Sequence, residues 1–79
     1  MKILVKAFVL VNSELAQEQH VLNDILKIEG VEEGFIVSGL IDLIFKIITP
    51  TQIQLEEIIN KELRQNKSIR TITILIVEK

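Results

Sequence analysis

Four stretches of the chain are dominated by Ile, Val, Leu and Phe, and their patterns predict β-strands. The first, ILVKAFVLV, is apolar on both sets of alternating positions except at Lys6, which is typical of a strand covered on both faces. The last, IRTITILIV, alternates isoleucine with threonine or leucine. The middle two are separated by Gly39 and Leu40 alone, which predicts a tight hairpin. The four predicted strands are residues 3–11, 31–38, 41–48 and 69–77.

The segment between the first two strands has the apolar spacing of an amphipathic helix. Asn12 and Ser13 are suitable N-cap residues, and Glu14 in the first turn suits the positive end of the helix dipole. We therefore expect a helix that begins there and runs to Lys27, with Gly30 in the left-handed conformation just beyond it. Its apolar stripe consists of Leu15, Val21, Leu22, Ile25 and Leu26.

The segment TPTQIQLEEIINKELRQN, residues 49–66, predicts a second amphipathic helix. Two capping boxes are open at its start, one from Thr49 to Gln52 and one from Thr51 to Gln54. Its apolar stripe consists of Leu55, Ile58, Ile59 and Leu63.

The order of these elements is β-α-β-β-α-β, in two βαβ halves of nearly equal length. With right-handed crossovers, this order gives an α+β fold: a ferredoxin-like βαββαβ sandwich with an antiparallel four-stranded sheet. No linker or low-complexity tract divides the chain, so we expect one domain spanning residues 1–79. Gly34 lies inside the second strand, where it suggests a bulge.

One face of the predicted sheet has no helix to cover it. Two helices cover only one face of a four-stranded sheet, and in a solitary domain the other face should be polar. Whichever face the helices cover here, the first and last strands still present aliphatic residues or Phe on the other. An apolar face of that size is unusual in monomers. We therefore expect dimerisation sheet to sheet, as in a dimeric α/β barrel.

Composition limits the chemistry that this chain can perform. There is no Cys, and His20 is the only histidine, so neither a metal site nor thiolate chemistry is expected. The net charge of −2 offers no basic field for nucleic acid, and Phe8, Phe35 and Phe45 are too few aromatics for base stacking. The apolar start is too short for a membrane helix. We expect a cytoplasmic protein without a cofactor.

Several segments together resemble the effector-binding (RAM) domain of the Lrp/AsnC feast/famine regulators. They are KAFVLVNS, LNDILKIEGV, VSGLIDLIFKI and RTITILIV, and the resemblance covers essentially the whole chain. The most specific part is the motif G-x-x-D, Gly39 to Asp42, before an apolar strand. The family often has an acidic residue and an aromatic inside this motif, where this chain has Leu40 and Ile41. Full-length members carry an N-terminal helix-turn-helix, so the chain looks like a stand-alone RAM protein.

The resemblance implies an assembly and a ligand. Dimers formed sheet to sheet would join into rings of about four or five dimers, an octamer or a decamer. Amino acids or similar small metabolites would bind in clefts between dimers. Co-assembly with a full-length Lrp/AsnC regulator is a further implied partnership, with no direct contact to nucleic acid or membrane. The implied effector-binding residues are Gly39, Leu40, Ile41, Asp42, Thr71 and Thr73.

Each of these residues also has a structural explanation. Asp42 can accept hydrogen bonds from backbone donors of its turn, or its carboxylate can receive the ammonium group of an amino acid. Gly39 can supply a positive φ, or let a ligand approach the backbone. Thr71 and Thr73 suit a half-exposed strand, or provide hydroxyls for a ligand carboxylate. Leu40 and Ile41 favour an apolar effector, such as a branched-chain amino acid, or none.

Two other functions compete with effector binding. Small ferredoxin-like dimers can be α/β-barrel enzymes, but such a reaction chamber needs inward polar or aromatic side chains, and these strands are nearly all aliphatic. The chain can also be a structural assembly subunit with a degenerate effector pocket. Fold analogy alone does not separate the binding module from the structural subunit.

Overall fold

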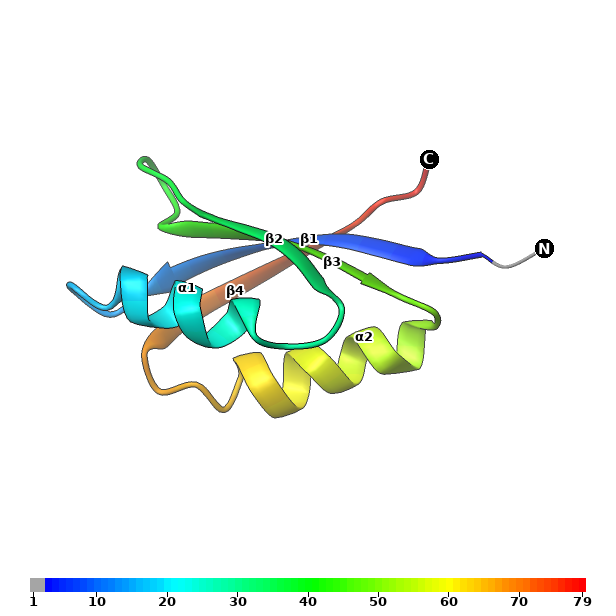
Figure 1. Cartoon of the computed structure of the whole chain (residues 1–79). Helices are drawn as coiled ribbons and strands as arrows, with labels where there is room; N and C mark the ends of the chain where they lie inside the picture. The colour runs from blue at the N-terminus through cyan, green and yellow to red at the C-terminus, as the bar shows by residue number, and fades with distance from the viewer. Residues whose placement is uncertain (1–2) are drawn as a thin grey trace.

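The computed structural model describes residues 3–79 and contains the six elements predicted from the sequence, with one addition at the end of the second helix. The sheet has the order β2-β3-β1-β4, and every neighbouring pair is antiparallel. Both helices lie on the same side of it (Figure 1). The ferredoxin-like fold is therefore confirmed. The elements are β1 (Val5–Ser13), α1 (Glu18–Leu26), β2 (Val31–Ile36), β3 (Leu43–Thr49), α2 (Gln52–Ile58), the π-helical turn η1 (Ile59–Leu63) and β4 (Ile69–Ile76).

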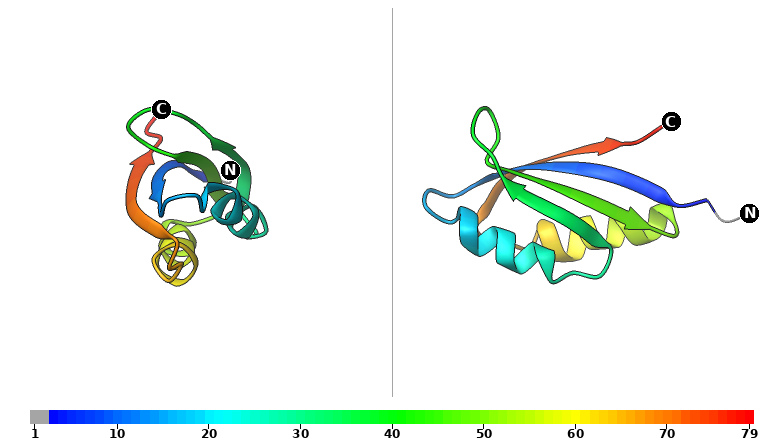
Figure 2. Two further views of the ribbon diagram at one scale, coloured as in Figure 1. Left: turned by 90° about the vertical axis from the view of Figure 1, so that its left-hand side faces the viewer. Right: turned by 45° about the horizontal axis from the view of Figure 1, so that its top comes forward.

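The core lies between the sheet and the two helices. Alternate residues of β1 and β3 are buried while their neighbours are only partly so, because successive strand side chains point to opposite faces. The predicted helix stripes supply the other half of the core through Val21 and Ile25 of α1 and Leu55 of α2. Figure 2 shows the two layers from the end and in a view tilted by 45°. The buried strand residues are Ala7, Val9, Val11, Leu43, Phe45 and Ile47.

The predicted start of the first helix is wrong. β1 continues to Ser13, and α1 begins only at Glu18, with Gln17 as its N-cap. The alternation of buried residues extends along β1 to Ser13, whose backbone N–H donates to the Asp42 carboxylate and not to a helix cap. Leu15, which was expected in the apolar stripe, is 91% exposed in the connecting turn, and Ala16 there has a φ of +63°.

The second helix begins at the later of the two candidate capping boxes. The hydroxyl oxygen of Thr51 accepts the N–H of Gln54 at 3.2 Å. At its other end the helix widens into η1, where the N–H of Arg64 reaches back to the carbonyl of Ile59 at 2.9 Å. This π-helical turn, closed by an i→i+5 hydrogen bond, was not predicted.

Gly34 is not the bulge that the sequence suggested. The register of β2 against β3 shifts between Val31 and Glu33, before Gly34 is reached. Gly34 instead lies against the ring of Phe45, where an added Cβ would come within 2.7 Å of two ring carbons. The glycine therefore makes room for the largest side chain of the core. Gly30 has the expected positive φ, +102°.

Candidate functional site

The face of the sheet opposite the helices is apolar, as the sequence predicted. We call it the open face. The strand registers place its residues in rows across the sheet: Phe35, Ile44, Leu10 and Thr73 form one row, and Glu33, Lys46, Phe8 and Leu75 form the next. Phe35 is 53% exposed and Leu75 is 50% exposed. Patches of this kind on soluble proteins are typically interaction surfaces.

An ion pair crosses the open face. The Nζ of Lys46 on β3 lies 3.2 Å from the Oε2 of Glu33 on β2. Together with Phe8, Phe35 and Ile44, this pair lines a hollow of about 60 Å³. The pair neutralises two charges of the apolar face, so the face can be covered without leaving either of them alone. The sequence alone did not identify Glu33 as the partner of Lys46.

The loop between β2 and β3 carries the G-x-x-D motif and leaves the sheet on the open side (Figure 1). Gly39 has a φ of +135°, and no atom lies within 4 Å of the position of an added Cβ. Leu40 is 97% exposed, while Ile41 is half-buried. The connection is longer than predicted, because β2 ends at Ile36 and β3 begins at Leu43. The loop therefore presents an apolar side chain to solvent at its tip.

Asp42 lies at the base of this loop and is bonded to β1. Its Oδ2 accepts the backbone N–H of Ser13 at 2.9 Å. Its own N–H donates to the carbonyl of Val11 at 3.0 Å, and its carbonyl accepts the N–H of Val37 at 2.8 Å. Asp42 is half-buried. The carboxylate therefore closes the end of the β1–β3 ladder.

Ser13 is the residue that sequence reasoning missed. Its Oγ is buried and has no hydrogen-bond partner within residues 3–79. It lies where the register of β1 against β4 shifts, next to the Asp42 carboxylate. The available signal was its place at the end of an alternating apolar strand, but its N-cap propensity pointed to a helix instead.

Thr71 and Thr73 lie on β4, on the other side of β1 from the loop. Thr71 pairs with Asn12 and Thr73 pairs with Leu10, and both threonines are exposed. Asp42 continues the β3 register beyond Leu43, so Asn12 separates it from Thr71. The structure thus brings Asp42 and the two threonines to the same end of the open face, with β1 between them.

The remaining titratable groups are dispersed over the surface. His20 is exposed and lies 3.6 Å from Asp24. Residues 3–79 contain no group of three or more His, Cys, Asp or Glu arranged to hold a metal ion. Lys61 pairs with Glu57 and Arg70 pairs with Glu14, both at 3.8 Å. Within the same residues, no helix is both long and apolar enough to cross a bilayer.

Comparison with known proteins gives a consistent result. The model of the Lrp/AsnC ligand binding domain matches residues 6–79. The crystal structure of FFRP-DM1 is 30% identical and has a TM-score of 0.89, with 92% of this chain and 97% of that chain covered. A hypothetical protein from Pyrococcus horikoshii, PHS023, is 29% identical with a TM-score of 0.91, covering 95% and 90%. No curated protein sequence gives a significant match.

Longer regulators share the fold over about half their length. The Neisseria meningitidis transcriptional regulator NMB0573, solved as a complex with L-Met, is 16% identical with a TM-score of 0.84. The alignment covers 95% of this chain and 50% of that chain. At this identity the likeness concerns the fold alone.

Proposed function

Because this chain belongs to the Lrp/AsnC ligand-binding domain family, we propose that residues 1–79 form one non-catalytic domain that binds an amino acid within a homo-oligomer. The L-Met complex of the Neisseria regulator supports an amino acid as the class of ligand. The aliphatic character of the open face supports a binding role over an enzymatic one. A reaction chamber would need polar groups facing inward, and the central charges of this face are already paired with each other.

The observation that carries the proposal is the uncovered apolar face. Phe8, Leu10, Ile44 and Leu75 lie together on one side of the sheet, and no helix of the described chain covers them. A second copy packed sheet to sheet would bury this area and place like residues around a two-fold axis. Interfaces of this kind are hydrophobic and often inseparable from the stability of the subunit.

The effector site of this proposal lies at the loop end of that interface. Gly39, Leu40 and Ile41 form its mouth, Asp42 receives the ligand ammonium with its second carboxylate oxygen, and a neighbouring chain contributes Thr71 and Thr73. Within one subunit, β1 separates Asp42 from Thr71 and Thr73. A ligand that contacts Asp42 of one chain and the threonines of a neighbouring chain therefore bridges the two chains. Assembly of dimers into rings of about four or five would create such clefts between dimers.

A regulatory role follows from shared interfaces. Subunits with the same sheet face can exchange between assemblies, so this protein would modulate transcription by co-assembling with a full-length Lrp/AsnC regulator. The chain itself would not contact DNA.

A thermal-shift screen against the twenty amino acids tests the ligand, and light scattering on the same sample tests the assembly. A ligand that binds only the folded assembly raises its melting temperature. We expect an oligomer that is stabilised by one or a few apolar amino acids. A monomer would contradict the whole proposal.

The exposed Leu40 and the open space at Gly39 favour one alternative, a purely structural assembly subunit with a degenerate pocket. An intact oligomer that no amino acid stabilises would decide for this alternative and against effector binding.

A further inference from the structure

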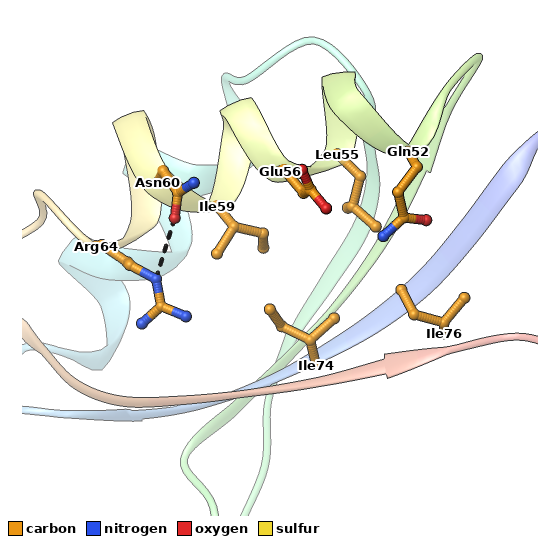
Figure 3. Close-up of a pocket in the computed structure, with 8 residues that line it drawn as sticks. All are labelled: Gln52, Leu55, Glu56, Ile59, Asn60, Arg64, Ile74 and Ile76. Atoms are coloured by element: carbon orange, nitrogen blue, oxygen red, sulfur yellow. Dashed lines mark hydrogen bonds between the residues drawn. The ribbon is translucent and has the colours of Figure 1, made fainter.

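A second hollow lies on the opposite side of the sheet from the open face, between the second helix and the edge strand β4. It is a groove of about 280 Å³ whose floor is aliphatic (Figure 3). Leu55 and Ile59 of the helix are buried, whereas Ile74 and Ile76 of β4 remain partly exposed at the floor. The volume is close to the lower end of the range of small-ligand pockets, about 300–1,000 Å³. The apolar floor is therefore open to a small molecule.

One end of the groove is positively charged. The guanidinium of Arg64 points down towards β4 (Figure 3), and its Nε donates to the Oδ1 of Asn60 at 3.3 Å. Within residues 3–79, no carboxylate lies at ion-pair distance from Arg64. Arg64 also lines an adjoining hollow with Arg70. The terminal N–H groups of Arg64 are thus available to a planar acceptor. A carboxylate has the geometry to accept two of them at once.

The π-helical turn supports this placement independently. Because the N–H of Arg64 bonds to the carbonyl of Ile59, the carbonyl of Asn60 loses its usual partner and accepts the side-chain amide of Gln65 at 3.5 Å. Such turns are rare in α-helices and are frequent at functional sites. Here the turn sets both Asn60 and Arg64 at the rim of the groove.

We propose that this groove binds an aliphatic monocarboxylate. Its carboxylate lies against Arg64 and Asn60, and its hydrocarbon chain covers Ile59 and Ile74. Glu56 projects into the same groove between Ile59 and Gln52, where it repels a second carboxylate, so dicarboxylates are rejected. This site does not rest on the proposed effector site, from which it is separated by the sheet.

Hexanoate is the test ligand, titrated into the full chain while backbone amides are followed by NMR. We expect saturable shifts at residues 59–64 and 74–76. Arg64→Gln should weaken hexanoate at least about tenfold, because a hydrogen-bonded charge partner is lost. Lys67→Gln removes the same charge from an exposed residue that does not line the groove, and its affinity should equal that of the unmodified protein.

The ligand series separates the charge from the hydrocarbon chain. Hexanol, hexylamine and hexanedioate should each bind at least about tenfold more weakly than hexanoate. If hexanol bound as tightly as hexanoate, the groove would be a non-specific apolar surface and the proposal would be overturned. Equal hexanoate affinity of Arg64→Gln and Lys67→Gln would overturn it as well. The series uses the unmodified protein, so it stays decisive if Arg64→Gln fails to fold. Asp42→Ala should leave hexanoate binding unchanged, which keeps this site distinct from the effector site.

Discussion

The Oδ2 of Asp42 accepts the backbone N–H of Ser13 at 2.9 Å, across 29 residues of sequence. This bond joins the loop that carries the G-x-x-D motif to the end of the central strand β1. It occupies one carboxylate oxygen with a structural task and leaves the other without a hydrogen-bond partner in residues 3–79. The structural role and the ligand-binding role of Asp42 are therefore compatible, because one oxygen can accept the backbone N–H while the other binds a ligand ammonium group.

Replacing Asp42 separates these two tasks. Asp42→Ala removes the acceptor of a half-buried amide, so we expect a loss of unfolding free energy of about 1–3 kcal/mol. Asp42→Asn retains an oxygen acceptor for Ser13 and should lose much less. Urea denaturation at one fixed protein concentration measures both values.

The Asn variant is also the sharper probe of the ligand. It keeps the tether to Ser13 but lacks the negative charge, so an amino acid that stabilises the unmodified protein should bind Asp42→Asn at least about tenfold more weakly. Equal thermal shifts in both proteins would remove Asp42 from the effector site.

Gly34 is a second position where one atom decides the packing. In Gly34→Ala the new Cβ meets the ring of Phe45 at 2.7 Å, and overpacking of this kind costs about 1–3 kcal/mol. Gly34→Ala should therefore cost less unfolding free energy in the Phe45→Leu background than in the unmodified protein. A double-mutant cycle in urea measures this difference. Gly39→Ala is the matched control: its cost comes from a φ of +135° in open space, so Phe45→Leu should not offset it. Simple additivity of Gly34→Ala and Phe45→Leu would contradict the packing explanation.

The sequence predicted the order of elements and the helix stripe that contains Ile25, because strand alternation and helix periodicity are local signals. It left open which face of the sheet the helices cover, and the structure buries the face that carries Val9 and Phe45. The start of the first helix was mispredicted because Asn12 and Ser13 suit both an N-cap and a strand end. The deciding partner, Asp42, is distant in sequence. The π-helical turn and the groove beside it have no local signal either, because Arg64 and Ile74 meet only after the fold forms.

We expect the chain alone not to bind duplex DNA of random sequence at physiological ionic strength. Its net charge is −2, and two of its basic residues near the second helix, Lys61 and Arg70, already pair with glutamates. Non-specific binding depends on many phosphate contacts, which this surface does not offer. Fluorescence anisotropy with a labelled duplex over a salt series measures it, and salt-dependent binding would contradict the expectation.

Phe8 is the best position at which to test the open face as an interface. It lies on the central strand β1, between Lys46 of β3 and Leu75 of β4 in one row of the face. Phe8→Asp would place an unpaired carboxylate inside a sheet-to-sheet contact, where burial without a partner is costly. We therefore expect the light-scattering mass to fall to that of one chain, or the protein to unfold.

Ile53→Asp provides the matched control, because it puts the same charge in place of an aliphatic residue of α2 that is 70% exposed on the helix side. Its mass should equal that of the unmodified oligomer. Circular dichroism separates unfolding from dissociation in Phe8→Asp, and either result supports the interface, because a subunit that unfolds when its face is spoiled depends on its partner. A folded Phe8→Asp protein with an unchanged oligomer mass would show that this face is not where the copies meet.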